Sequence, residues 1–109
     1  MRVVTCISFL TFALALAAPA AAQDKIAAGK KVYADNKCAV CHSIGGVGNK
    51  KFPLDGAGKM SVDEIKGWLT DPKAEADKDG KKLVPPMKSY KTLPPADFDA
   101  LVIYLQSLK

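Results

Sequence analysis

Three residues with reactive side chains stand together in the run Cys38-Ala39-Val40-Cys41-His42. C-x-x-C-H is the attachment signature of c-type haem. Cysteines at this spacing on a helical turn can present both thiols to one edge of a flat macrocycle, where each forms a thioether with a vinyl group. The histidine that follows them then lies under the iron, as its proximal axial ligand. The run therefore predicts one haem c, attached through Cys38 and Cys41 and ligated by His42.

Other kinds of site use the same residue types. A structural zinc site needs four ligands, whereas the chain has three cysteines, including Cys6 in an apolar leader, and His42 as its single histidine. A thioredoxin-type redox pair is expected in a βαβ setting, and no strand-like alternation surrounds the motif. A structural disulfide between Cys38 and Cys41 is compatible with an exported protein. The redox pair and the disulfide stay open as alternatives.

The first 22 of the 109 residues differ in kind from the rest. A basic start precedes a mostly apolar run, which ends in the three alanines 20–22. This arrangement predicts a signal peptide of residues 1–22, cleaved after Ala22, and a single domain over residues 23–109. The apolar run approaches the ~20 residues of a transmembrane helix, so an uncleaved anchor is the alternative.

Export and charge together restrict the partners. The full chain has a formal charge of +5, and loss of Arg2 with the leader leaves 15 lysines against 11 acidic residues. Basic faces steer a protein towards acidic partners, and the lysines expected near the signature are Lys37, Lys50, Lys51, Lys88 and Lys91. Export makes nucleic-acid binding improbable. We expect a soluble, monomeric periplasmic protein without membrane attachment once the leader is removed.

Helical patterns account for most of the predicted domain. A first helix is expected from Asp24, as its N-cap, to Asp35-Asn36. Ser61 and Glu64 form a capping box, and the helix that they begin should stop at Asp71-Pro72. A last helix, from about Pro94-Pro95 to Lys109, carries an apolar stripe of Phe98, Leu101, Val102, Leu105 and Leu108.

The segments between these helices are expected to be irregular. Residues 43–51 are rich in glycine and predict a flexible loop, and the charged residues 73–82 predict a solvated loop. With only helices as regular elements, the chain is predicted to be all-α, with about three to five short helices around one covalently bound haem.

The second axial ligand would decide the function. An open sixth site favours gas binding or peroxide chemistry, whereas a second protein ligand favours electron transfer. Without a second histidine, the candidates are Met60 and Met87. Met60 directly precedes Ser61 and is expected to pack at a helix start. Met87 follows Pro85-Pro86, whose fixed φ angles reduce the entropy lost on ordering the loop. Met87 is therefore the predicted ligand and Met60 the alternative.

Residues 24–109 resemble the class I cytochromes c, small monohaem electron carriers with His/Met ligation. The parts that carry the resemblance are the signature, the turn Pro53-Leu54, the helix of residues 65–70, Met87 and the last helix. The charged stretch between Pro72 and Met87 is longer than in the best-known mitochondrial members, which leaves the subfamily open.

The resemblance implies roles for further residues. The Pro53 carbonyl would accept a hydrogen bond from the far nitrogen of His42, fixing the ring and raising its basicity. The residues around the haem pocket would be Pro53, Leu54, Trp68 and Leu69. Gly29 and Tyr33 would pack against Leu101 and Tyr104, where the terminal helices cross.

The predicted function is that of an exported electron carrier, not an enzyme, with redox proteins that have acidic docking faces as partners. One alternative is a haem-containing subunit of a larger oxidase or reductase. Another is a gas-binding or peroxidase protein with a labile sixth site, although no distal histidine or arginine is present in residues 23–109 to handle bound peroxide.

Overall fold

The first element of the computed structural model, which describes residues 20–109, is a long helix, α1 (Ala20–Asp35). Its end agrees with the prediction. Its start is at Ala20 and not at Asp24, because alanine is the strongest helix former and carries the helix back past the predicted N-cap. Residues 1–19 of the predicted leader lie outside the described residues, so the leader and its cleavage after Ala22 stay predictions.

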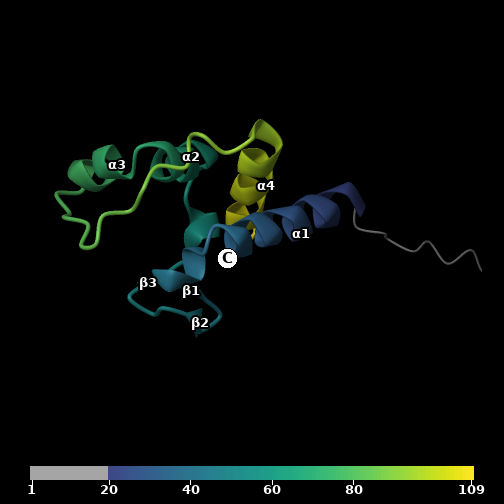
Figure 1. Cartoon of the computed structure of the whole chain (residues 1–109), viewed down its shortest axis with the longest axis horizontal. Helices are drawn as coiled ribbons and strands as arrows, with labels where there is room; N and C mark the ends of the chain where they lie inside the picture. The colour runs from purple at the N-terminus through teal and green to yellow at the C-terminus, as the bar shows by residue number, and fades with distance from the viewer. Residues whose placement is uncertain (1–19) are drawn as a thin grey trace, which may run out of the picture.

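Within the described residues, α1 is followed by short elements and then by three more α-helices (Figure 1). Two of the short elements are 3-10 helices, labelled η. The order is η1 (Cys38–Val40), β1 (His42–Ile44), β2 (Val47–Gly48), β3 (Phe52–Pro53), η2 (Ala57–Lys59), α2 (Val62–Thr70), α3 (Pro72–Lys78) and α4 (Pro95–Gln106).

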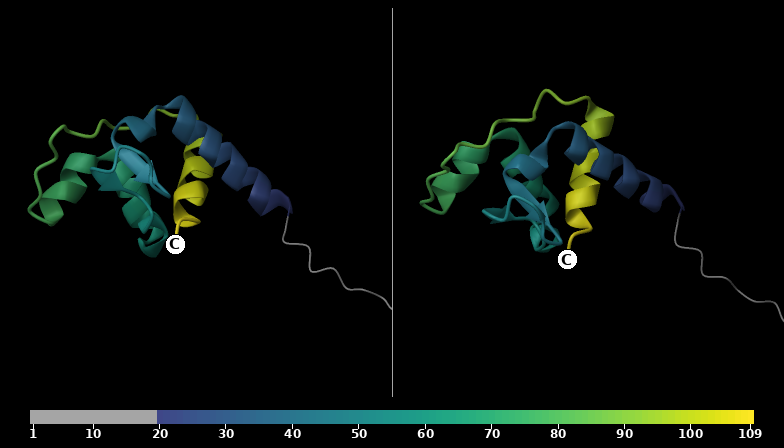
Figure 2. Two further views of the ribbon diagram at one scale, coloured as in Figure 1. Left: turned by 90° about the horizontal axis from the view of Figure 1, so that it is seen from below. Right: turned by 60° about the horizontal axis from the view of Figure 1, so that its bottom comes forward.

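The two terminal helices α1 and α4 cross, as both views of Figure 2 show. A Cβ atom added at Gly29 would overlap the Ala100 carbonyl oxygen and would lie 2.5 Å from the Cβ of Tyr104. The absence of a side chain at Gly29 is what lets the backbones approach so closely. Because α1 ends just before the signature, this crossing fixes where the signature begins.

The hydrophobic core surrounds this crossing and extends to α2. Leu101 and Ile65 are its most deeply buried side chains, each 1% exposed. Burial of side chains of this size contributes about 1.5–3 kcal/mol each, which makes the core the main source of stability. The buried core cluster consists of Val32, Tyr33, Ala57, Ile65, Leu69, Leu101, Val102, Tyr104 and Leu105.

Helix α2 has the predicted boundaries, whereas α3 was not predicted. The Ser61 side chain accepts a hydrogen bond from the Glu64 N–H at 3.1 Å, which caps the start of α2. Asp71, with φ −141° and ψ 73°, ends it. The same Asp71 side chain accepts from the Ala74 N–H at 3.1 Å and caps α3. The prediction of a loop over residues 73–82 is thus wrong for residues 73–78.

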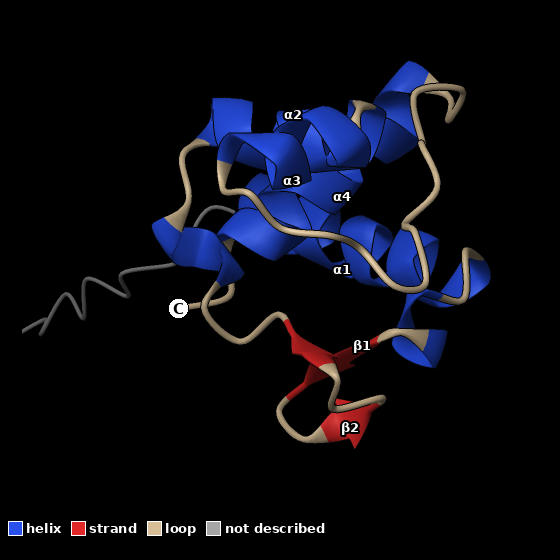
Figure 3. Cartoon of the chain, turned by 90° about the vertical axis from the view of Figure 1, so that its left-hand side faces the viewer, coloured by secondary structure: helices blue, strands red, loops and turns tan. Residues whose placement is uncertain are grey.

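A three-stranded sheet, in the order β2-β1-β3, begins at the last residue of the signature and interrupts the helices (Figure 3). β1 pairs antiparallel with β2 and parallel with β3, with His42 opposite Phe52 and Ser43 opposite Pro53. The fold is mostly helical, as predicted, but it is not strictly all-α. Strands of two or three residues are too short to produce a readable alternation of polar and apolar residues, so the glycine-rich run 43–51 resembled a plain loop.

Among residues 20–109, no helix combines the length and the apolar character that crossing a bilayer requires.

Candidate functional site

The signature occupies η1 and the start of β1. Lys37, with a left-handed φ of 55°, turns the chain out of α1 and into η1. Cys38 and Cys41 are both half-buried free thiols. Burial raises the pKa of the Cys38 thiol, while a backbone hydrogen bond and the ammonium group of Lys88 act in the opposite direction. Two unpaired thiols three positions apart are available for covalent attachment.

The His42 ring is fixed by the sheet. Its Nδ1 lies 3.0 Å from the carbonyl oxygen of Phe52. A carbonyl can only accept, so Nδ1 carries the proton and Nε2 keeps its lone pair free for a metal. The acceptor is the residue before Pro53, whose carbonyl the resemblance implied. The β1–β3 register explains the difference, because it sets His42 opposite Phe52.

The zinc alternative finds no support in the described part of the chain. No group of three or more His, Cys, Asp or Glu side chains in residues 20–109 is arranged to hold a metal ion. Haem iron needs no such cluster, because the porphyrin supplies four ligands and the protein supplies the axial ones.

Met87 lies on the long segment that connects α3 to α4. Its half-buried side chain packs against the hydrophobic core cluster. Just beyond it, the Ser89 hydroxyl donates to the Thr70 carbonyl at 2.6 Å and the Tyr90 N–H donates to the Leu69 carbonyl at 2.7 Å. Both bonds fasten the segment to the end of α2, on the downstream side of Met87.

Charged and phenolic groups that follow Met87 act electrostatically on the cysteines of the signature. Burial raises the pKa of Tyr90, and the thiols of Cys38 and Cys41 add to that shift. The Lys88 ammonium acts on Cys38, as described above. Met60, the alternative ligand, closes η2, and its N–H donates to the Ala57 carbonyl at 3.1 Å. Both methionines contact the core, but the segment around Met87 is the one whose charged and phenolic groups act on the cysteines.

The other predicted site residues fall into two groups. Of the four expected around the pocket, Leu69 is buried, Leu54 and Trp68 are half-buried, and Pro53 is exposed. The four expected at the helix crossing are all buried there. Tyr33 meets Tyr104 edge to face, with ring centroids 5.9 Å apart and an interplanar angle of 71°.

The donor groups of this site fit a covalently held haem. Two free thiols can attach such a group, and an imidazole with one free nitrogen can ligate its iron. The buried Tyr33 hydroxyl is, in addition, left without a hydrogen-bond partner among the described residues. Buried polar groups normally find partners, so this hydroxyl is an exception among the described residues.

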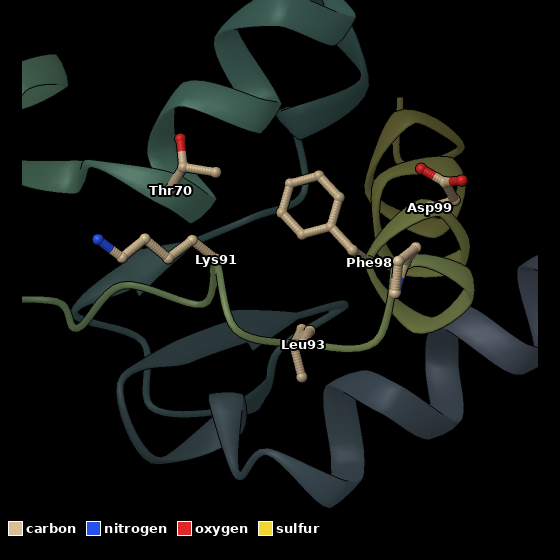
Figure 4. Close-up of a pocket in the computed structure, with 6 residues that line it drawn as sticks. Thr70, Lys91, Leu93, Phe98 and Asp99 are labelled. Atoms are coloured by element: carbon tan, nitrogen blue, oxygen red, sulfur yellow. The ribbon is translucent and has the colours of Figure 1, made fainter.

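A pocket of about 270 Å³ lies between the end of α2, the segment that follows Met87 and the start of α4. Figure 4 shows Phe98 projecting from α4 into this space, with Leu93 and Lys91 on the connecting segment and Thr70 at the end of α2. None of its lining residues belongs to the signature. Leu93 and Phe98 also pack against the core cluster, and the packing of Leu93 helps to hold the segment that follows Met87.

Three large apolar side chains are exposed near the signature. Val40, Val47 and Val84 are 66%, 76% and 67% exposed. Asn49 Nδ2 donates to the Val40 carbonyl at 3.0 Å, and Lys51 Nζ donates to the Val84 carbonyl at 2.7 Å. Hydrogen bonds thus join the three segments on which these valines stand. The bond between Lys51 and Val84 could not be predicted from the sequence, because the partners are far apart in the chain and one is a backbone atom.

Comparison with known proteins gives a consistent result. The family model for Cytochrome c matches residues 26–109. Cytochrome c oxidase subunit 2 of Alkalihalophilus pseudofirmus (strain ATCC BAA-2126 / JCM 17055 / OF4) is 29% identical over 91 residues, which cover 74% of this chain and 25% of that protein. The chain thus spans about a quarter of the length of this curated relative. No solved structure matches.

Proposed function

The chain belongs to the cytochrome c family, and we propose on this basis that it is an exported electron carrier with His42 and Met87 as axial ligands. The cofactor of the family is haem c, covalently bound and containing iron. We assign the two thioether links to Cys38 and Cys41. The observation that carries the assignment of His42 as an iron ligand is the orientation of its ring, which Phe52 holds through Nδ1 while Nε2 stays free.

Each residue of the site has a task in this proposal. When bound, haem c supplies an iron centre that accepts and releases one electron. The thioethers of Cys38 and Cys41 hold the group in place. The Phe52 carbonyl keeps the His42 ring from turning and makes its free nitrogen a stronger donor. The Met87 sulfur would be the second protein ligand of the iron and, as the partner of a histidine, would raise the reduction potential.

Transfer to and from a partner needs a surface close to the signature. The exposed valines Val40, Val47 and Val84 offer a small apolar contact. Exposed lysines stand on the same segments, and the ones we assign to the docking face are Lys37, Lys50, Lys51, Lys88 and Lys91. Exposed lysines on the segments that carry exposed apolar side chains suit redox proteins with acidic docking faces and raise association rates at low salt.

The predicted leader of residues 1–22 is part of the same proposal. Removal of the leader after Ala22 would release residues 23–109 to the periplasm as a single monomeric domain. An intact mass of the exported protein that includes residues 1–22 would contradict this part.

A second candidate function is that of a haem-containing domain within a larger oxidase. The observation that favours it is the 29% identity to a protein named cytochrome c oxidase subunit 2. Cross-linking in a periplasmic extract distinguishes the two, since a free carrier migrates at its own mass and a subunit migrates with its complex.

Carbon monoxide tests the proposal against gas-binding and peroxidase alternatives. The visible spectrum of the reduced protein at neutral pH should not change promptly when the gas is added, because Met87 occupies the sixth position. Prompt binding would mean an open or labile site and would contradict the proposed ligand pair.

A further inference from the structure

Among the described residues, the segment that precedes Met87 has a single hydrogen bond to the rest of the protein. After α3, the Lys81 N–H donates to the Ala76 carbonyl at 2.9 Å, and the next bonds are those of Ser89 and Tyr90. Between them, one hydrogen bond within residues 20–109 involves residues 82–88: Lys51 Nζ donates to the Val84 carbonyl at 2.7 Å. The position of this segment (Figure 1) therefore depends on Lys51.

Lys51 stands beside the residue that holds the proximal ligand. Its ammonium lies 5.5 Å from the centroid of the Phe52 ring, a distance at which a cation is attracted to an aromatic face. The Phe52 carbonyl is the atom that fixes His42, at 3.0 Å from Nδ1. Phe52, in β3, thus contacts the histidine ring, and Lys51, directly before β3, contacts the segment that leads to Met87.

The chain between Val84 and Met87 can transmit this contact. Pro85 and Pro86 have φ fixed by their rings, so the position of the Val84 carbonyl restricts where Met87 can lie. Downstream, Ser89 and Tyr90 are fastened to the end of α2. Met87, whose own side chain packs against the core cluster, therefore lies between two hydrogen bonds on its downstream side and one on its upstream side.

We propose that Lys51 is a positioning residue for Met87, tying the segment that carries this ligand to the strand that holds His42. The proposal rests on the proposed ligation by Met87. Without the Lys51 ammonium, the segment would open more often and leave the sixth position exposed to small ligands. The apparent affinity for such a ligand rises in proportion to the population of the open state. Loss of one charge-assisted hydrogen bond at the surface should raise this apparent affinity by roughly threefold to tenfold.

Imidazole binding to the ferric holoprotein measures this opening. Imidazole is neutral and competes directly with the methionine, and its binding is followed in the visible spectrum. The variants are Lys51→Met, which keeps the aliphatic stem without the donor, and Lys51→Arg, which keeps charge and donor. Lys50→Met is the matched control, with the same loss of charge one residue away and no bond to Val84. Met87→Ala gives the value for a fully open site.

The proposal expects Lys51→Met to lower the apparent Kd for imidazole by roughly threefold to tenfold, with Lys50→Met at the wild-type value and Lys51→Arg close to it. Equal values for Lys51→Met and Lys50→Met would overturn the role of Lys51 and leave ligation by Met87 intact. A Met87→Ala protein that binds imidazole no better than wild type would overturn the ligation, and with it the positioning role.

Discussion

Replacement of Gly29 by alanine tests the helix crossing on which the placement of the signature depends. A Cβ at position 29 would overlap the Ala100 carbonyl oxygen and approach the Cβ of Tyr104 to 2.5 Å. Neither neighbour can move aside by a side-chain rotation. The Ala100 oxygen is a backbone atom, and the Tyr104 Cβ is bonded directly to the backbone of its own residue. Alanine at this position must therefore push α1 and α4 apart.

The size of the effect follows from two opposing terms. Alanine favours a helix interior over glycine by about 1 kcal/mol. Overpacking of a rigid contact costs about 1–3 kcal/mol, and the upper end applies because Tyr33, Leu101 and Tyr104 lose contact when the helices separate. The net loss is about 2 kcal/mol, which corresponds to a fall in Tm of roughly 8–16 °C for a domain of this size.

Thermal unfolding of the holoprotein, followed by far-ultraviolet circular dichroism, measures this loss. Ala27→Gly, at an exposed position of the same helix, is the matched control and should cost about 1 kcal/mol from helix propensity alone. The two substitutions are opposite in chemistry and should both destabilise. A Gly29→Ala protein at least as stable as wild type would refute a close crossing at this residue.

Three further predictions concern the cap of α2, the buried tyrosine and the basic surface. Ser61→Ala should lower the free energy of unfolding by about 1 kcal/mol, measured by denaturant titration, because the Glu64 N–H loses its acceptor; an unchanged value would contradict the cap. Burial raises the pKa of Tyr33 to about 12 from 10.0, so the folded state keeps a proton that the unfolded state loses between these values. The corresponding stability is complete below pH 10 and lost as the pH rises to 12. Tyr33→Phe, which removes a hydroxyl without a partner among the described residues, should be at least as stable as wild type at pH 7 and should lose less stability over that range. Electron-transfer rates with an acidic partner should fall as ionic strength rises, and a flat salt profile in stopped-flow measurements would remove the role of the lysines.

Local sequence signals predicted the elements that local chemistry determines. Ser61 and Glu64 mark the start of α2 through a bond between neighbours in the chain, and Pro72 marks its end. The same Pro72 stands at the first position of α3, where proline is favoured, and Asp71 caps that helix. The charges of residues 73–82 suggested a loop, although Asp71-Pro72 was also a readable start signal.

The features that could not be predicted from the sequence depend on pairing between residues far apart in the chain. The short strands form because β1 finds β2 on one side and β3 on the other, and their two or three residues have no periodicity of their own. The register of β1 and β3 makes Phe52, and not Pro53, the acceptor for His42. The tie from Lys51 to Val84 likewise depends on how the chain folds back, and composition alone gives no hint of it.

Carbon monoxide binding to two methionine variants tests the central claim, which is that Met87 closes the iron site opposite His42. In the reduced state at neutral pH, Met87→Ala should bind the gas promptly, with a clear change in the visible spectrum. Met60→Ala, in which the methionine that closes η2 is removed, should behave like wild type and stay unreactive. Prompt binding by the Met60 variant together with an unreactive Met87 variant would contradict the account and move the ligand to Met60.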